Sequence, residues 1–318
     1  MKPFSRGGEN SRHINASVLT FTKEHTMQIN RRKFLERSLA LGAAATLPLN
    51  AFAEDEKATR RATDVIELGP AKVKVSRMAV GTGTYGAGHS SNQLRALGVN
   101  GVAEMLTSAY DKGIFFWDTA DSYGTHDAVK AALKKVPREK VTVLTKTDAW
   151  NAQKTKEDID RFLKELGTDY IDILLLHTRM SGTWNVEDKG SMEVMAEAKE
   201  KKILRSVGIS CHSVEAMLVA SKNPWLDVCM VRLNPSGDRM DDAPDTVLPI
   251  VKQMKANGKG TIGIKVLGEG NLAYGQDHNA ALRYALTKDA LNCFSIGCES
   301  FKEVEDNISR IEKLAVPA

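Results

Sequence analysis

The sequence is poor in cysteine, in aromatic residues and in long hydrophobic runs. Only 4 of its 318 residues are cysteine and only 6% are aromatic. So little cysteine excludes a disulfide-rich scaffold, and the absence of any C-x₂-C spacing gives no indication of a ferredoxin cluster or a structural zinc site. We therefore expect no metal. With 42% hydrophobic and 26% charged residues, the composition is that of an ordinary folded protein.

The chain also lacks an excess of one charge outside its first 53 residues. The formal net charge is +4. Residues 1–53 contain eight Lys or Arg and three Glu, which leaves 36 basic and 37 acidic residues in the remainder. The basic character therefore belongs to the leader, and the body has no nucleic-acid-binding signature.

Residues 30–53, NRRKFLERSLALGAAATLPLNAFA, have the layout of an export signal. A pair of arginines precedes an apolar stretch from Leu39 to Leu49, and Ala51-Phe52-Ala53 is a small-x-small ending. The stretch is shorter than the roughly 20 residues of a membrane span, so we expect no stable membrane anchor. Arg31-Arg32 followed by Phe34-Leu35 resembles the twin-arginine (Tat) consensus.

The leader pattern predicts twin-arginine export to the periplasm with cleavage after Ala53, and Met27 is an alternative translation start. Tat export moves folded proteins, so the resemblance implies the Tat machinery as a partner and a cofactor inserted in the cytoplasm. An amphipathic helix packed on the body is the alternative interpretation. No helical face persists along the stretch, which disfavours that alternative.

After a polar linker over residues 54–63, the chain alternates strand-like and helix-like segments. Residues 65–68 and 73–75 flank a Gly69-Pro70 turn and predict a short β-hairpin. Eight strand–helix units follow, which predicts an α/β fold: a (β/α)₈ TIM barrel over residues 64–318 with a short N-terminal β-hairpin. The predicted barrel strands are 78–80, 114–117, 141–144, 171–176, 206–209, 228–231, 262–265 and 293–296.

Polar residues stand where three successive strands end, which in this fold is the catalytic face. Asp118, Lys146 and His177 each follow an apolar strand, and Tyr123 lies in the loop after Asp118. Each alone could cap a helix, sit on the surface or pack in the core. Together they predict a site, because a charged group at the end of a buried strand is costly unless it is paired.

These four residues suit the reduction of a carbonyl group. An ammonium beside a phenol stabilises the phenolate and lowers the tyrosine pKa. Asp118 would hold Lys146 charged, neutral His177 would direct the carbonyl oxygen by a hydrogen bond, and Tyr123 would donate the proton. The hydride then has to come from a cofactor.

The motifs FFWDTADSYG, LTK and ILLLH resemble those of the aldo-keto reductases, from about Val65 to the C-terminus. The resemblance implies an NAD(P)H-dependent oxidoreductase whose catalytic tetrad is Asp118, Tyr123, Lys146 and His177, acting on a small aldehyde or ketone. It also implies cofactor-binding residues, which are Gly81, Thr82, Ser210, Cys211, Met230, Lys265, Leu267, Gly268, Gly297, Glu299, Lys302 and Asn307.

Several of these positions depart from the family pattern. Cys211, Met230 and Leu233 stand where the family has Asn, Gln and Tyr around the nicotinamide. Glu299 stands where many members have a cation for the 2′-phosphate of NADP, with Lys302 as a partial replacement. The expected cofactor is NADP(H), with NAD(H) as the alternative.

Two other functions compete with a reductase. The departures favour a cofactor-binding barrel with a sensor or partner role and little activity, and His126, His177 and Asp118 could serve a metal-dependent hydrolase or lyase. Residues 86–100 and 178–189 are the candidate substrate loops. The sequence indicates neither the substrate nor the oligomeric state.

Overall fold

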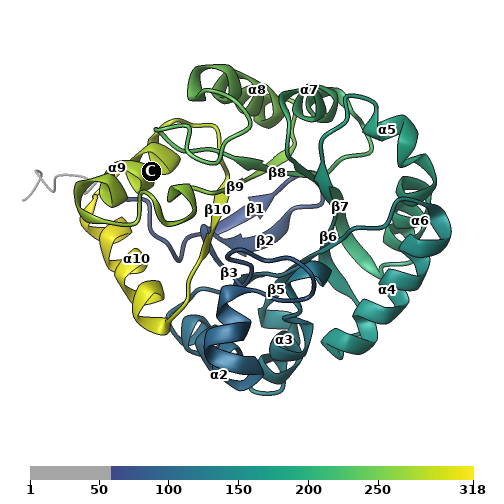
Figure 1. Ribbon diagram of the computed structural model, residues 1–318, viewed down its shortest axis with the longest axis horizontal. Helices are drawn as coiled ribbons and strands as arrows, with labels where there is room; N and C mark the ends of the chain where they lie inside the picture. The colour runs from purple at the N-terminus through teal and green to yellow at the C-terminus, as the bar shows by residue number, and fades with distance from the viewer. Residues whose placement is uncertain (1–58) are drawn as a thin grey trace, which may run out of the picture. The chain divides into compact units, whose positions relative to one another are not determined.

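A computed structural model of the protein describes residues 59–318 (Figure 1). The predicted signal peptide and its cleavage site after Ala53 lie outside the described residues. Part of the predicted linker is described, and there Arg60 donates its backbone N–H to the carbonyl of Val316 at 2.8 Å, while Thr59 forms a bridge with Pro317. None of the described helices is long and apolar enough to cross a membrane.

Eight parallel strands close into a barrel, which confirms the predicted (β/α)₈ architecture (Figure 1). The strands follow one another around the ring in chain order, and the last pairs with the first through Phe294 and Met78. The barrel strands are β3 (Met78–Gly81), β4 (Phe116–Asp118), β5 (Thr142–Thr147), β6 (Ile171–Arg179), β7 (Leu204–Cys211), β8 (Val228–Arg232), β9 (Gly260–Ile264) and β10 (Cys293–Gly297).

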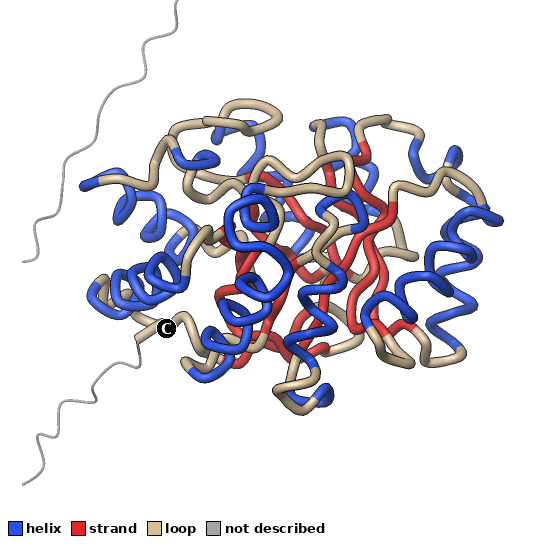
Figure 2. Tube along the Cα trace, turned by 60° about the horizontal axis from the view of Figure 1, so that its bottom comes forward, coloured by secondary structure: helices blue, strands red, loops and turns tan. Residues whose placement is uncertain are grey.

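Helices surround the strands, as Figure 2 shows from a second side. Their apolar faces pack on the outside of the barrel in one continuous core that includes Leu106, Phe162 and Ile311. The helices are α2 (Asn92–Asp111), α3 (His126–Leu133), α4 (Ala152–Leu166), α5 (Trp184–Glu187), α6 (Lys189–Glu200), α7 (Val214–Lys222), α8 (Pro244–Ala256), α9 (Gly275–Thr287) and α10 (Phe301–Lys313).

The predicted hairpin is present as β1 (Val65–Leu68) and β2 (Val73–Ser76), which pair antiparallel. Figure 1 shows it inside the ring of strands. Leu68, Val73 and Val75 are buried together with residues that point into the barrel, among them Phe116 and Leu144. The hairpin thus adds its apolar face to the barrel interior, at the end where the strands begin.

Helix α2 includes residues that the sequence analysis assigned to a loop. Residues 92–100 belong to it, although the sequence placed them in a substrate loop. The Ser91 side chain caps the helix by accepting from the N–H of Leu94, while Gly98 interrupts it with a φ of 64°. Because the backbone at Gly98 is not helical, the apolar periodicity of the first two turns is out of phase with the rest of the helix. The second candidate loop is also partly regular, because β6 continues to Arg179 and α5 follows.

All four cysteines lie in the described residues, and all four are buried free thiols. Cys211 and Cys229 lie on neighbouring strands with their sulfur atoms 3.3 Å apart. Burial raises the pKa of Cys298 to about 12 and holds the pKa of the Cys211 and Cys293 thiols well above their ordinary value.

Candidate active site

The barrel brings Asp118, Lys146 and Tyr123 together at the carboxyl end of the strands. Asp118 is the last residue of β4, and Lys146 is the fifth of the six residues of β5. The Lys146 ammonium lies 2.5 Å from Asp118 Oδ1 and 3.4 Å from the phenol oxygen of Tyr123. The side chains of Lys146 and Asp118 are 1% and 7% exposed, so this is a buried ion pair that touches a phenol.

Two further contacts hold this pair, and the sequence did not reveal them. Lys146 also donates to the backbone carbonyl of Thr119 at 2.8 Å, and Ser295 donates its hydroxyl to Asp118 Oδ2 at 2.7 Å. The Lys146 ammonium therefore has three oxygen partners, and both Asp118 oxygens are hydrogen-bonded. Such saturation offsets the desolvation cost of the buried charges.

The electrostatics of the pair differ from the expectation in one respect. Burial alone would lower the pKa of Lys146, but Asp118 and Tyr123 together raise it above its ordinary value, so the ammonium is charged. The pKa of Tyr123 is raised, because desolvation outweighs the opposing effect of Lys146. We expected a lowered tyrosine pKa from the neighbouring ammonium alone. The phenol is a protonated donor at neutral pH.

Two glycines shape the place of the Tyr123 ring. A Cβ atom added at Gly83 or at Gly86 would overlap the ring from either position. Neither glycine has a positive φ, so the requirement for glycine here comes from close packing rather than from backbone conformation. The segment after β3 therefore fixes where the phenol can lie.

His177 lies beside Tyr123 near the end of β6, with the ring centroids 5.7 Å apart in an edge-on arrangement. Its Nδ1 lies 3.0 Å from a carboxylate oxygen of Asp148. Burial lowers the pKa of His177, and Asp148 partly opposes this shift, so the ring is neutral near pH 7. Because a carboxylate only accepts hydrogen bonds, this contact favours the tautomer of the neutral ring that has its proton on Nδ1.

This tautomer differs from the one that the expected role of His177 requires, and that role stays a prediction. Its Nε2 then carries a lone pair, so the neutral ring cannot donate a hydrogen bond to a carbonyl oxygen from that atom. Tyr123 remains as the donor beside the ion pair.

A cleft of about 340 Å³ opens next to Asp118 and Tyr123 and continues to the start of α10. One side is formed by the segment after β3, the other by the loop after β9. Its far end is acidic, because Glu299, Glu303 and Asp306 line it. Within residues 59–318, the one Lys or Arg that lines this cleft is Lys265, and its ammonium is paired with Glu269.

A buried histidine at the same end has an unused ring nitrogen. His278 Nε2 lies 2.7 Å from Asn307 Oδ1, while His278 Nδ1 makes no hydrogen bond within the described part of the chain. Both residues line the cleft. Asn92 donates to Glu299 Oε1 at 2.7 Å and holds that carboxylate in place. The far end of the cleft thus offers fixed polar groups to a ligand.

Comparison with known proteins identifies the family. Residues 77–315 match the model of the aldo/keto reductase family, which is most of the described chain. The chain belongs to the aldo/keto reductase family. It is similar to an aldo-keto reductase of Mycolicibacterium paratuberculosis, with 33% identity over 140 residues, 41% of this chain and 47% of the relative.

Another relative of this aldo/keto reductase is the NADH-specific methylglyoxal reductase of Escherichia coli, which is 28% identical over 166 residues, 45% of this chain and 50% of the relative. The chain thus spans about half the length of the curated relatives it matches. Two solved structures share its fold. The holo form of an aldo-keto reductase from Bacillus halodurans has a TM-score of 0.61 at 21% identity, covering 80% of this chain and 97% of that one. A Bombyx mori aldo-keto reductase in complex with NADP has a TM-score of 0.60 at 18% identity, covering 80% and 92%.

The predicted cofactor residues of this aldo/keto reductase fall into two groups. Seven of them line the cleft, namely Gly81, Met230, Lys265, Leu267, Gly297, Glu299 and Asn307. The other five lie outside its lining, namely Thr82, Ser210, Cys211, Gly268 and Lys302.

Four of these five residues have other surroundings. Thr82 is buried and shares a hydrogen bond with Thr125 at 2.8 Å. Ser210 and Cys211 are buried in β7, where the serine hydroxyl lies 3.1 Å from His212 Nε2 and the thiol faces Cys229. Lys302 is exposed on α10. The expectation that Lys302 replaces a missing cation for the 2′-phosphate therefore finds no support in its position.

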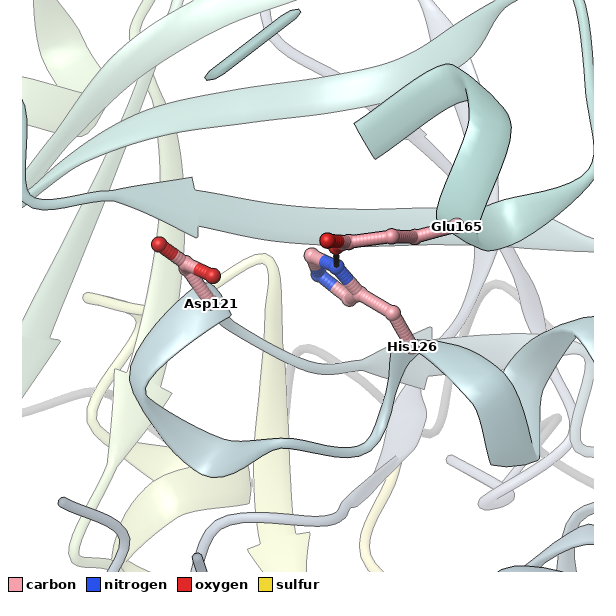
Figure 3. Close-up of side chains that lie close together, drawn as sticks. All are labelled: Asp121, His126 and Glu165. Atoms are coloured by element: carbon pink, nitrogen blue, oxygen red, sulfur yellow. Dashed lines mark hydrogen bonds and ion pairs between the residues drawn. The ribbon is translucent and has the colours of Figure 1, made fainter. Parts of the chain in front are cut away.

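Asp121, His126 and Glu165 lie close enough to share a metal ion, as Figure 3 shows. The two nitrogens of His126 are already engaged, at 2.7 Å from Glu165 Oε2 and 2.7 Å from Thr145 Oγ1. Both carboxylates are bound by the guanidinium of Arg161. The cation of this cluster is Arg161. The hydrolase interpretation requires His126 to contact His177 and Asp118, but among the described residues it contacts neither.

Proposed function

We propose that this protein is an NAD(P)H-dependent oxidoreductase that reduces a small aldehyde or ketone to an alcohol. One observation carries the proposal: the Tyr123 phenol lies 3.4 Å from an ammonium that is itself held by a buried carboxylate, at the edge of a cleft that continues to residues of α10. The methylglyoxal reductase among the relatives supports a carbonyl substrate.

The chain's own residues would handle the proton. Tyr123 donates its phenolic proton to the carbonyl oxygen as that oxygen gains negative charge. The phenolate left behind is stabilised by Lys146, whose own charge Asp118 maintains, and solvent then returns the proton to Tyr123. His177 packs against the tyrosine ring and limits its movement. A reduced nicotinamide, when bound, would supply the hydride.

The cleft fits a dinucleotide in its polar groups. His278 Nδ1, which makes no hydrogen bond within the described residues, lies at the end where the resemblance to the family places adenosine. The three carboxylates at that end would accept a hydrogen bond from a ribose 2′-hydroxyl but would repel a 2′-phosphate. We therefore propose that NADH is preferred over NADPH, in contrast to the preference expected from the sequence. Fluorescence titration should give a lower Kd for NADH than for NADPH, and Glu299→Lys should bring the two Kd values closer together.

Tyr123→Phe tests the proposed function. We expect NADH-dependent reduction of carbonyl compounds such as methylglyoxal to fall by about 10²–10⁴-fold, because a positioned general acid contributes that much. The Kd for NADH should stay the same. Tyr284→Phe, on α9 outside the cleft lining, is the matched control and should keep full activity. Full activity in Tyr123→Phe would contradict the proposal. Cofactor binding without turnover in the wild type would favour the sensor or partner role.

We also propose that the protein is exported by the twin-arginine pathway, on the strength of Arg31-Arg32 and the Ala51-Phe52-Ala53 ending. Replacing both arginines by lysine should retain the full-length chain in the cytoplasm. Mass spectrometry of the periplasmic product should show a chain that begins at Glu54, and a product that begins elsewhere would overturn the predicted cleavage.

A further inference from the structure

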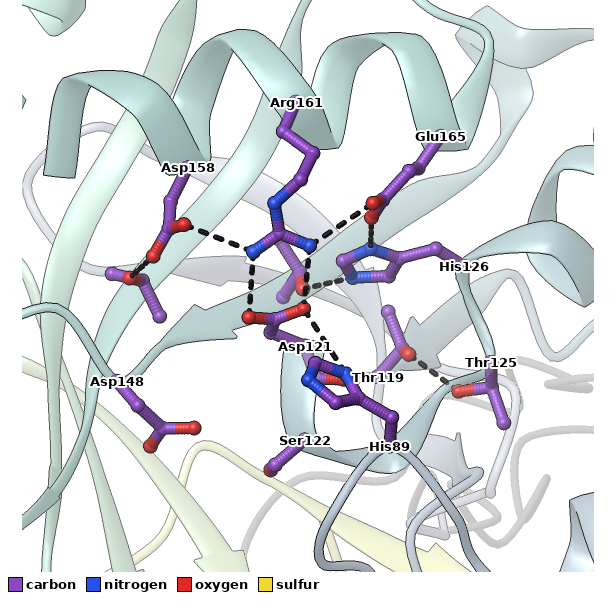
Figure 4. Close-up of polar contacts among 12 residues, drawn as sticks. His89, Thr119, Asp121, Ser122, Thr125, His126, Asp148, Asp158, Arg161 and Glu165 are labelled. Atoms are coloured by element: carbon purple, nitrogen blue, oxygen red, sulfur yellow. Dashed lines mark hydrogen bonds and ion pairs between the residues drawn. The ribbon is translucent and has the colours of Figure 1, made fainter. Parts of the chain in front are cut away.

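A network of ionic contacts surrounds the turn that carries Tyr123 (Figure 4). The turn is the 3₁₀ helix Asp121–Tyr123, and its first residue is bound by Arg161 of α4. The two terminal nitrogens of Arg161 lie 2.8 and 2.7 Å from the two carboxylate oxygens of Asp121. This fork-to-fork contact fixes both the distance and the orientation of the turn relative to α4.

The same guanidinium is tied to the strand that carries Lys146. Arg161 donates to Asp158 at 2.9 Å, and Asp158 accepts the hydroxyl of Thr147 at 2.6 Å. Thr147 is the residue directly after Lys146 in β5. The Asp158 side chain is 2% exposed, and several hydrogen bonds outweigh its burial and lower its pKa, so it is an ionised anchor.

A second route runs through a histidine. Arg161 donates to Glu165 at 3.0 Å, Glu165 binds His126 Nδ1 at 2.7 Å, and His126 Nε2 lies 2.7 Å from the hydroxyl of Thr145. Thr145 is the residue directly before Lys146. The hydrogen bond with His126 is the main cause that lowers the pKa of Glu165 to about 2.

We propose that Arg161 is a positioning residue that sets the distance between the Tyr123 phenol and the Lys146 ammonium. Its guanidinium binds the tyrosine turn directly. Through Asp158 and through the His126–Glu165 pair, it is also connected to the two residues that flank Lys146 in β5. It touches neither the cleft lining nor the reacting atoms, so it acts through the two residues that do. This inference rests on the proposed function, in which Tyr123 and Lys146 move the proton.

The contact at stake is sensitive to small displacements. The phenol oxygen lies 3.4 Å from the ammonium, at the outer limit of a hydrogen bond. A displacement of the turn by about 1 Å would break this contact, and misplacement on that scale costs about 10²-fold in rate. Without the Asp121–Arg161 fork, the one charged or titratable partner left to the Asp121 carboxylate among residues 59–318 is the exposed ring of His89.

Arg161→Gln is the first variant. We expect kcat to fall about 10- to 100-fold, while the Kd for NADH stays unchanged because Arg161 lies outside the cleft lining. Arg161→Lys keeps the charge but not the planar fork, so its kcat should lie between that of the wild type and that of Arg161→Gln.

Arg138→Gln is the matched control. Arg138 also binds a buried carboxylate, that of Asp172 at 2.8 Å, but next to the first residues of β5 and β6, at the opposite end of the barrel. Its loss should lower the melting temperature as much as Arg161→Gln does and leave kcat unchanged. Equal effects of the two variants on kcat would overturn the proposal, because Arg161 would then be merely structural. A wild-type kcat in folded Arg161→Gln would overturn it as well.

Asp121→Asn gives a milder change if Arg161→Gln does not fold. It should lower kcat in the same direction, and wild-type activity there would also refute the proposal. In the double variant the two losses should sum to less than their total, because both substitutions remove the contact between Asp121 and Arg161. Tyr123→Phe distinguishes a failure of the proposed function from a failure of the role of Arg161. Activity in Tyr123→Phe refutes the proposed function. An inactive Tyr123→Phe together with fully active Asp121→Asn and Arg161→Gln refutes only the role of Arg161.

Discussion

Replacing Lys146 by Met would leave Asp118 as a buried carboxylate without its ionic partner. The side chains are of similar length, so the change removes charge more than volume. Asp118 is 7% exposed at its side chain and would keep one hydrogen bond, from Ser295. Removing one partner of a buried ion pair costs about 3–5 kcal/mol, because the other charge stays uncompensated.

This cost is large enough to measure by thermal unfolding. For a chain of this size 1 kcal/mol corresponds to about 2–4 °C, so we expect the melting temperature of Lys146→Met to fall by about 6–20 °C. The double variant Asp118→Asn with Lys146→Met removes both charges and should recover most of that loss. Lys255→Met serves as a control, because its partner Asp289 is 75% exposed and such surface pairs contribute about 0–1 kcal/mol.

These melting temperatures test whether Asp118 depends on Lys146 to compensate its buried charge. A melting temperature of Lys146→Met equal to that of Lys255→Met would contradict the expected cost, since Asp118 would then have lost nothing by losing its partner. A double variant as unstable as the single one would also refute it. Both measurements need only purified protein and circular dichroism.

Two further predictions concern the neighbours of Tyr123. Gly83→Ala should displace the tyrosine ring and lower kcat with little change in NADH affinity. Gly190→Ala, whose Cβ would come within 3.3 Å of the Ala152 Cβ but of no part of the tyrosine, should leave kcat unchanged. Unchanged kcat in Gly83→Ala would show that the ring is free to move. Asp148→Asn should lower the pKa of His177, because the carboxylate favours the protonated ring and is the main group that opposes the effect of burial. NMR titration of the His177 ring checks this, and an unchanged or higher pKa would contradict the contact between His177 and Asp148.

The chain order and the strand ends could be read from the sequence because they depend on local patterns. Each barrel strand is a short apolar run, and a polar residue such as Asp118, Lys146 or His177 stands out at its end. The parallel register then places these three at one mouth, as the pairings of Asp118 with Leu144 and of Lys146 with Leu175 show. Hydrophobic periodicity carries that information without knowledge of the partners.

The contacts that hold the site could not be read in the same way. Ser295 is 177 residues away from Asp118, and Arg161 is 40 residues away from Asp121. In the sequence Arg161 looks like an ordinary helix cation with acidic neighbours at i−3 and i+4, because its contact with Asp121 is made to another element. The raised pKa of Tyr123 was missed for a related reason, because burial is a property of the assembled fold while the nearby lysine is visible as a motif.

The burial of every native thiol has a practical consequence. Thiol-directed labels need an accessible thiolate, and Cys211, Cys229, Cys293 and Cys298 offer none on the folded barrel. A single cysteine introduced on the surface would therefore react selectively without prior removal of the others. Tyr274, at the rim of the cleft and 78% exposed, is a suitable place. A fluorophore attached there would report the arrival of a dinucleotide directly, independently of any turnover.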